Sequence, residues 1–364
     1  MTYNKKTPYN DLPLLPKNTD LKGERFLPLL IKARAEIAEL KGYLHSIPTN
    51  PMLIISPSIL RESVASSEIE DIHTTLVDVL QTQLLTEEIK KGSGADKEVL
   101  RYRDALIWGF ENLKEKSLST RLIFGVHKKL IPDMSEDYRR DQNYIAERST
   151  GEILYTPPST NEIARLMYDW ENFVNDAKNE QIDPLIKCAI AHYQFEAIHP
   201  FSDGNGRTGR ILIVLQLVKE NLLQLPALFI SGYLIKNRSE YYRQIRQVTD
   251  TGKWDEYTSF MLTAFYRQAQ ETKRALLFAK IAYDSFKATI KKDFAGFYSA
   301  DLINILFSFP VINPSKLAEE LSIHRVTASK YLKAMTKAGL LKEKKSGIYH
   351  FYVNYKLLDA MQNK

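Results

Sequence analysis

The sequence predicts a mainly α fold, in which a helical body carries one β-hairpin and a small C-terminal domain of helices and strands follows. Three observations support this. Apolar residues recur at helical spacing over most of the first 290 residues. That spacing is interrupted once, over residues 143–158, where turn-forming residues gather. Beyond residue 300, short helical segments lead into two strand-like segments. A chain of 364 residues has room for two or three domains at roughly 100–200 residues each.

The helices of the body follow from apolar residues three and four apart. In Arg25–His45, for example, Leu30, Ala33 and Ile37 fall on one face between charged positions. The same pattern predicts further helices over residues 57–72, 76–85, 97–110, 120–130, 163–177, 184–195, 206–220, 240–250 and 254 to about 292.

The interruption predicts a short hairpin. The segments Tyr144-Ile145-Ala146 and Ile153-Leu154-Tyr155 flank Arg148-Ser149-Thr150-Gly151, and Pro157-Pro158 closes the unit. An exposed hairpin edge can add an extended peptide as a further strand. An ordinary surface hairpin is the alternative.

Composition narrows the class of protein. Apolar residues make up 44% and charged residues 26%, as in ordinary globular proteins. The single cysteine, Cys188, excludes an intrachain disulfide and fits a reducing compartment. The longest apolar run, Ile211–Val218, is far shorter than the ~20 residues of a membrane helix. We therefore expect a soluble cytoplasmic protein with no membrane partner.

The net charge of +6 is local. Residues 301–364 hold 10 Lys and Arg against 5 Asp and Glu, which leaves 40 against 39 for the first 300. If excess positive charge attracts an anionic partner, that attraction is therefore expected at the C-terminal domain.

One segment, HPFSDGNGRTGR at residues 199–210, concentrates chemistry. Gly204 and Gly206 flank Asn205 directly before an apolar helix, so backbone N–H groups and the helix dipole converge on one anion site. Arg207 and Arg210 are three residues apart and share a helix face beside that site. A polyphosphate is the ligand that this arrangement favours.

Two further residues point to group transfer. Asp203 is a hard oxygen ligand suited to Mg²⁺ that bridges phosphates. His199 is the residue of the segment whose ordinary pKa suits a proton acceptor near neutral pH. A glycine turn, a histidine or two arginines alone are more often structural, but their combination favours nucleotidyl or phosphoryl transfer.

The segment resembles the Fic-domain signature, His-x-Phe-x-(Asp/Glu)-Gly-Asn-Gly-Arg-x-x-Arg, at every specified position. Residues 138–145, 155–158 and 237–242 resemble the family's stretches before the flap, on its far side and in its later segment. The resemblance covers roughly residues 20–270.

The resemblance implies a protein adenylyltransferase. ATP would place its phosphates on the turn Gly204–Gly206, with Mg²⁺ on Asp203, and His199 would take the proton of a Ser, Thr or Tyr hydroxyl of a target protein. Phe201 would be a core anchor. A branch of the family that phosphorylates carries Lys where this chain has Gly206, which favours AMP transfer. The expected ATP-binding residues are Gln194, Gly204, Asn205, Gly206, Arg207, Thr208, Gly209, Arg210 and Tyr242, with Asn205 expected on the α-phosphate.

A second resemblance concerns regulation. Ser66 and Glu70 match the family's inhibitory motif, (Ser/Thr)-x-x-x-Glu-(Gly/Asn), and Asp71 departs from its last position. The resemblance implies that Glu70 pairs with Arg210 and blocks seating of the γ-phosphate. Two alternatives stay open: Ser67-x-x-Glu70 is also a capping-box pattern, and Glu70 could activate water for removal of AMP.

The C-terminal segment predicts helices over residues 301–309, 314–321 and 325–338, then strands over 340–344 and 348–353 turned at Ser346-Gly347. This order resembles a winged helix-turn-helix. The basic residues on its third helix and wing are mostly lysines, and this composition favours contact with the DNA backbone over recognition of bases. Dimerisation is the alternative. The residues are Arg325, Ser329, Lys330, Lys333, Lys337, Lys342, Lys344 and Lys345.

We therefore expect an N-terminal helical region with the inhibitory helix over residues 1–100, a Fic core over 101–275, a linker helix over 276–299 and the winged domain over 300–364. The expected partners are a protein substrate docked on the hairpin 144–155 and DNA at the C-terminal domain, with a homodimer left open. The rival hypotheses are a DNA-binding regulator whose Fic body senses nucleotide, and a Fic enzyme that removes AMP or transfers another nucleotide.

Overall fold

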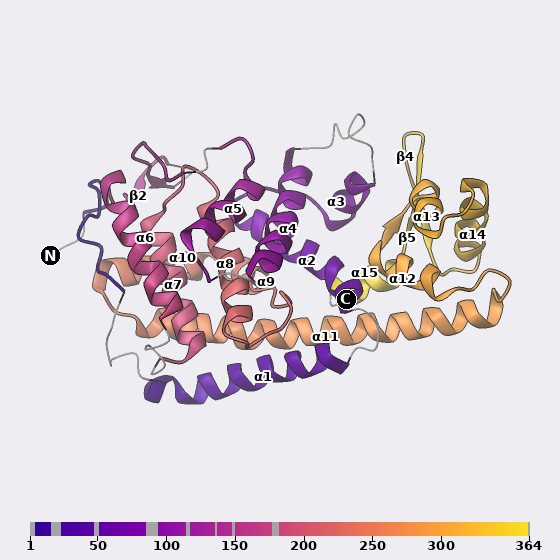
Figure 1. The fold of residues 1–364 in the computed structure, drawn as a ribbon, viewed down its shortest axis with the longest axis horizontal. Helices are drawn as coiled ribbons and strands as arrows, with labels where there is room; N and C mark the ends of the chain where they lie inside the picture. Colours follow the sequence, from indigo (N-terminus) through magenta and orange to yellow (C-terminus); the bar gives the residue numbers. More distant parts are fainter. Residues whose placement is uncertain are drawn as a thin grey trace.

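The computed structural model describes residues 4–15, 23–46, 51–84, 94–113, 117–134, 137–147, 150–176 and 182–362. It is mainly helical, which confirms the predicted fold class. The helix α11 (Asp255–Asp293) runs along the length of the molecule, and α1 (Leu27–Ser46) lies beside it (Figure 1). α1 presents Leu30, Ala33 and Ile37 to this contact, and Lys273 of α11 pairs with Glu36 at 2.9 Å.

The centre of the body is formed by α7 (Pro184–Ile198) and α8 (Asn205–Lys219), which pack on each other. Nearly every residue of both helices is buried, as expected for helices that are covered on all sides. They are surrounded by α4 (Gly94–Leu113), α5 (Thr120–Leu130), α6 (Thr160–Asn175) and α11. The loop between α7 and α8 is therefore held by the core at both ends.

A second layer of helices lies against this centre. It comprises α2 (Pro51–Ile69), α3 (Leu76–Gln83), α9 (Ser231–Lys236) and α10 (Arg238–Thr251). α2 contacts α4, α8 and α9 of the body and also α12 and α15 of the C-terminal domain. The predicted start of α2 at Pro57 was wrong: the helix passes through Pro57, which is buried. Tertiary packing there outweighs the preference of proline for a helix start.

The predicted hairpin is confirmed. Strands β1 (Ile145–Ala146) and β2 (Ile153–Tyr155) pair in antiparallel register, with Ile145 opposite Tyr155 and Ala146 opposite Ile153. Arg148 and Ser149 of the predicted turn lie outside the described residues. The hydroxyl of Tyr155 donates to the carbonyl of Ala197 at 2.7 Å, so the hairpin is fixed next to the end of α7.

The C-terminal domain contains α12 (Ala300–Ser308), α13 (Pro314–Leu321) and α14 (Arg325–Lys337), with a sheet in the order β3 (Val311–Ile312), β5 (Tyr349–Val353), β4 (Lys342–Ser346), and ends with α15 (Tyr355–Gln362) (Figure 1). This is the predicted helix and wing order. The first wing strand begins two residues later than predicted, because the N–H of Leu340 donates to the carbonyl of Met335 at 2.9 Å and so belongs to the turn that ends α14.

Three short elements escaped prediction: β3, α9 and α15. Each has eight residues or fewer, too few for a clear period. α11 is continuous across residue 275, so the expected linker 276–299 is mostly the second half of that helix. The described residues were also compared with the requirements for a membrane-spanning helix. None of the helices in these described residues is both long enough and apolar enough to cross a membrane.

Candidate active site

His199 lies directly after the last turn of α7. Its backbone is left-handed, with φ of 50°, and its N–H donates to the carbonyl of Phe195 at 3.0 Å. Arg139 Nε donates to the carbonyl of His199 at 3.0 Å and fixes the peptide from the other side. Nδ1 of His199 is buried.

The protonation state of His199 follows from its surroundings. Burial lowers its pKa to about 4, although the charge of Glu70 acts in the opposite direction. Arg139 lowers the pKa further. The imidazole is therefore neutral at neutral pH, which is the state that accepts a proton.

The glycine turn begins α8. Gly204 has a φ of 75°, and a Cβ there would approach Cδ1 of Ile131 to 2.5 Å, so the turn requires glycine. The side chain of Asn205 accepts from the N–H of Phe201 at 2.8 Å and donates to its carbonyl at 2.7 Å. The amide of Asn205 is thus engaged within the loop, whereas the sequence resemblance predicts it on a phosphate.

Phe201 occupies the core, as predicted, and its ring stacks on His127 of α5 with centroids 3.8 Å apart. Nε2 of His127 lies 3.0 Å from the carbonyl oxygen of Asp203, and burial lowers the pKa of His127. The loop from His199 to Gly204 is therefore held from α5 as well as from its own ends.

Asp203 is the exposed carboxylate of the loop. Oδ1 accepts from the N–H of Gly204 at 2.6 Å, and Oδ2 lies 3.7 Å from Nη2 of Arg207. Its side chain is 61% exposed. The described residues contain no group of three or more His, Cys, Asp or Glu side chains placed to hold a metal. A single accessible carboxylate suits Mg²⁺, which keeps several waters and takes its other ligands from substrate phosphates.

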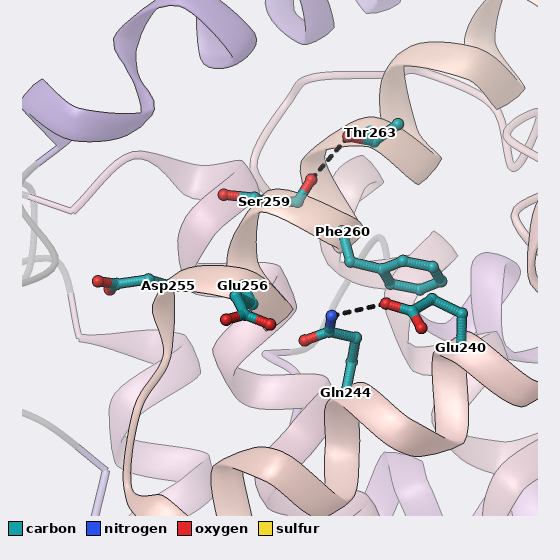
Figure 2. A pocket seen from close by; sticks show the side chains of 7 residues that line it. All are labelled: Glu240, Gln244, Asp255, Glu256, Ser259, Phe260 and Thr263. Atoms are coloured by element: carbon teal, nitrogen blue, oxygen red, sulfur yellow. Dashed lines mark hydrogen bonds between the residues drawn. The ribbon is translucent and has the colours of Figure 1, made fainter.

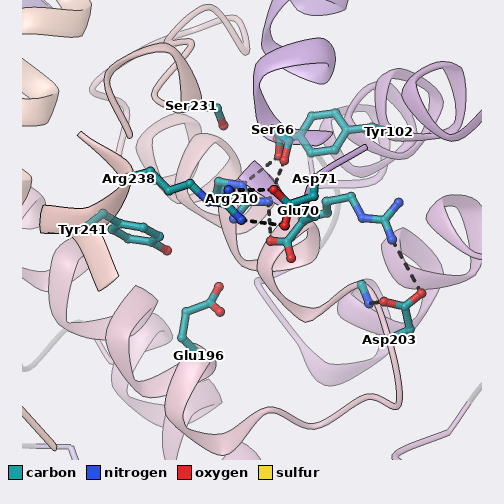
Figure 3. Close-up of polar contacts among 12 residues, drawn as sticks. Ser66, Glu70, Asp71, Tyr102, Glu196, Asp203, Arg210, Ser231, Arg238 and Tyr241 are labelled. Atoms are coloured by element: carbon teal, nitrogen blue, oxygen red, sulfur yellow. Dashed lines mark hydrogen bonds and ion pairs between the residues drawn. The ribbon is translucent and has the colours of Figure 1, made fainter. Parts of the chain in front are cut away.

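The two signature arginines are both buried on the first turns of α8. Nη1 of Arg207 donates to Oε2 of Glu98 at 2.7 Å, and its Nε has no partner among the described residues. Arg210 makes three contacts with the end of α2, shown in Figure 3: Nε to Ser66 Oγ at 2.8 Å, and Nη2 to the Ser66 carbonyl and to Glu70 Oε1, both at 2.9 Å.

The Glu70 carboxylate is therefore seated on Arg210, in the geometry that the sequence resemblance predicts. Burial disfavours its charge, but Arg210, together with Arg207 and His199, keeps its pKa below the ordinary value. A Cβ at Gly206 would collide with Oε1 of Glu70, so glycine is what allows the carboxylate to approach the turn. The capping-box alternative for Ser67 and Glu70 was wrong, because both lie at the C-terminal end of α2.

The remaining residues predicted to bind ATP differ in where their side chains lie. Nε2 of Gln194 donates to the carbonyl of Pro13 at 2.9 Å, so its amide faces the N-terminal segment. Oγ1 of Thr208 is buried with no partner among the described residues. Gly209 packs against Phe195 of α7. Tyr242 of α10 is exposed, and the guanidinium group of Arg238 lies 5.8 Å from the centre of its ring.

Sequence reasoning missed several acids and bases that surround this site. Glu98, Arg139 and Glu196 are three of them. Burial raises the pKa of Glu196 to about 8. The carboxyl group of Glu196 lies near Arg210 and Tyr241 (Figure 3). Glu62 of α2 accepts from Ser231 N–H at 3.0 Å and anchors α2 to α9. No local motif distinguishes these residues, because their roles depend on which helices pack together.

A hollow of about 400 Å³ between α10 and α11 is unrelated to this site (Figure 2). Carboxylates of Glu240, Asp255 and Glu256 line it, so it would repel a phosphate. Glu240 is engaged by Arg243 and Gln244, and Asp255 by Arg25.

Comparison with known proteins agrees with this geometry. The Fic/DOC family model matches residues 117–217, and the Fic/DOC family N-terminal model matches residues 27–111. The model for the C-terminal domain of SoFic-like protein adenylyltransferases matches residues 283–357. Together these matches span most of the chain. It belongs to the Fic/DOC family.

Curated relatives of this Fic protein carry the name protein adenylyltransferase. The Fic protein of Drosophila grimshawi is 27% identical over 173 residues, which are 46% of this chain and 33% of the relative. The Fic protein of Drosophila mojavensis is 31% identical over 128 residues, or 34% and 23%. Caenorhabditis elegans fic-1 is 34% identical over 91 residues, or 25% and 17%. The chain thus spans a third or less of the length of these relatives.

Solved structures share the fold. A Fic family protein from Desulfovibrio desulfuricans G20 superposes with a TM-score of 0.55 at 20% identity, covering 94% of this chain and 98% of the other. A fragment of Fic-1 from C. elegans superposes with a TM-score of 0.52 at 19% identity, covering 68% and 73%. At these identities the likeness supports the fold alone.

Proposed function

We propose that this Fic protein is a protein adenylyltransferase that moves AMP from ATP to a Ser, Thr or Tyr hydroxyl of a protein, itself included. The observation that carries the proposal is a neutral His199 held beside the glycine turn Gly204–Gly206 and the two arginines of α8. The names of the curated relatives support it. The rival view, a nucleotide sensor with no reaction, does not account for an intact base.

In the proposed reaction, His199 takes the proton of the target hydroxyl as that oxygen attacks the α-phosphorus of ATP. A new oxygen–phosphorus bond forms, the bond between the α- and β-phosphates breaks, and pyrophosphate leaves with its electron pair. The backbone N–H groups at the start of α8 and the guanidinium groups of Arg207 and Arg210 stabilise negative charge on the phosphates. Asp203 would hold Mg²⁺, which supplies further positive charge to the phosphates when bound.

Inhibition by Glu70 is part of the proposal. Nη2 of Arg210 bonds Glu70 and Nε bonds Ser66, so these two donors are not available to a phosphate while Glu70 is in place. Because Glu70 and a phosphate oxygen compete for one guanidinium group, displacement of Glu70 is required before ATP seats productively. Use of Glu70 to activate water for removal of AMP remains the alternative role.

The hairpin is the proposed docking site for the protein substrate. Tyr144, directly before β1, is 56% exposed, and Tyr155 of β2 ties the hairpin to Ala197, two residues before His199. A peptide paired to the β1 edge would thus run close to the catalytic base.

We also propose that the C-terminal domain binds a DNA backbone. A groove of about 670 Å³ between α14 and the wing is lined by Arg325, Lys330 and Lys333. β4 adds further exposed cations, Lys342, Lys344 and Lys345. All of these cations belong to the set predicted from the sequence, and Arg325, Lys330 and Lys333 line the groove.

The experiment for the main proposal compares two labels of ATP. Purified Glu70→Gly protein is incubated with ATP carrying radiolabel in the α-phosphate or in the γ-phosphate. Adenylylation transfers only the α-label to protein, whereas phosphorylation transfers only the γ-label. Glu70→Gly combined with His199→Ala is the matched control and should take up neither. Transfer of the γ-label, or no transfer with Glu70→Gly, would overturn the proposal.

A further inference from the structure

The last turn of α2 has the geometry of a Schellman motif. Asp71 is left-handed, with φ of 60°. The N–H of Ile72 donates to the carbonyl of Ser67, and the N–H of Asp71 to that of Glu68, both at 3.0 Å. Glycine and asparagine are the residues that favour such a left-handed position, and aspartate is among the few others that tolerate it. The departure of Asp71 from the inhibitory motif therefore leaves the turn intact.

Two carboxylates at this end of α2 carry an electrostatic cost. The carbonyl end of a helix is its negative pole, where acidic side chains are disfavoured. Each acid has its own arginine from a different helix, as Figure 3 shows: Glu70 pairs with Arg210 of α8, and Asp71 pairs with Arg238 of α10. The second pair is bidentate, with Nη1 to Oδ1 at 2.7 Å and Nη2 to Oδ2 at 2.9 Å.

Arg238 is itself well positioned for this contact. It is the first residue of α10, and its guanidinium group lies 5.8 Å from the centre of the Tyr242 ring. Arg238 donates both hydrogen bonds of the pair to the Asp71 carboxylate, and this contact raises the pKa of the guanidinium group. Bidentate pairing fixes orientation as well as distance, because two parallel bonds restrain the guanidinium plane.

We infer that the Asp71 and Arg238 pair is a second anchor of the inhibitory turn and positions Glu70 on Arg210. Glu70 and Asp71 are consecutive residues of one rigid turn, so Glu70 cannot leave α8 by a movement of that turn unless Asp71 also leaves α10. The inhibition in this chain thus depends on two helices, α8 and α10, and Asp71 acts through Glu70 as a positioning residue. This inference rests on the proposed adenylyltransferase activity and its inhibition by Glu70.

The test is Asp71→Asn, which keeps the size of the side chain and the tolerance for a left-handed backbone but removes the charge. Auto-labelling from α-labelled ATP should rise about 5-fold over wild type, the effect of losing roughly 1 kcal/mol of a partly exposed pair. Glu70→Gly should label more strongly still. Adding Asp71→Asn to Glu70→Gly should change nothing further, because the anchor acts only through Glu70.

The matched control is Glu240→Gln, which removes a partner of Arg243 on the same helix α10 and should label as wild type does. Equal labelling by wild type and Asp71→Asn would overturn the anchor. A further rise in the Glu70→Gly background would also overturn it, since that result would show an effect independent of Glu70.

Hydrogen exchange separates failure of the anchor from failure of the proposed activity. The amides of Asp71 and Ile72, which donate within the turn, should exchange faster in Asp71→Asn and at the wild-type rate in Glu240→Gln. If Glu70→Gly takes up no AMP, the proposed activity fails, and exchange alone then decides the anchor. Unchanged exchange in Asp71→Asn would refute it.

Discussion

Oε2 of Glu98 accepts a hydrogen bond from Nη1 of Arg207 at 2.7 Å. Arg207 is buried on α8, whereas Glu98 comes from α4 and is 35% exposed. Both signature arginines are therefore paired with carboxylates from the N-terminal region, Arg207 with Glu98 and Arg210 with Glu70. The two contacts differ, because only the second is accompanied by a motif recognisable in the sequence.

This pair yields a prediction about ATP binding. Glu98→Gln removes the charge that competes with phosphate for Arg207, so the KM for ATP should fall about 3-fold in the Glu70→Gly background, with kcat little changed. A 3-fold change in KM corresponds to the loss of a partly exposed ion pair, which stabilises by less than about 1 kcal/mol. Initial rates of α-label uptake against ATP concentration measure it. If Glu98 instead holds Arg207 in its working position, KM will rise.

The pH dependence of labelling tests the state of His199. Its pKa of about 4 means that the neutral form persists well below pH 6, and loss of base activity occurs only as pH falls through the pKa. Because Glu70 raises the pKa of His199, its removal lowers that value further. The rate for Glu70→Gly should therefore stay nearly constant from pH 8 to about pH 5. A midpoint near the ordinary histidine value of about 6.5 would contradict this burial effect.

Asn205 should contribute to stability even without nucleotide. Its side chain satisfies both the N–H and the carbonyl of buried Phe201. Asn205→Ala leaves the buried N–H of Phe201 without a partner, whereas the carbonyl of Phe201 keeps its hydrogen bond from Nδ2 of Asn143 at 3.2 Å. The substitution should lower the free energy of unfolding by about 2 kcal/mol. Asn112→Ala is the control, because it loses a single bond to the carbonyl of Trp108 on the half-buried face of α4. Urea unfolding of the ligand-free proteins measures both, and equal losses would show that Asn205 has no special structural role.

The sequence predicted the parts of this site that are local in the chain. His199, the turn at Gly204 and the arginines of α8 lie within one segment of twelve residues, so spacing alone determines which of them share a face. Glu98, Arg139 and Glu62 could not be found in that way, because 60 or more residues separate each from its partner. Their positions follow from how α4, α2 and the segment before the hairpin pack on the centre.

Asp71 shows a different limit of sequence reasoning. Asp71 departs from the last position of the inhibitory motif, but the backbone there forms a regular Schellman turn, and the Asp71 side chain pairs with Arg238. A pattern of allowed residues records the conformation required at a position, here a left-handed one. It does not record which distant residue will pair with the side chain.

The groove of the C-terminal domain gives the last prediction. Lys333→Glu should weaken binding of a double-stranded DNA fragment and reduce the slope of log affinity against log salt concentration by about 1, because one phosphate contact is lost. Lys291→Glu makes the same charge change near the end of α11, outside the groove, and should leave the slope unchanged. Fluorescence anisotropy over a range of salt concentrations measures both variants. Identical behaviour of the two would mean that net charge, and not the groove between α14 and the wing, attracts the DNA. No binding by the wild-type protein at low salt would exclude a DNA partner and favour dimerisation as the role of this domain.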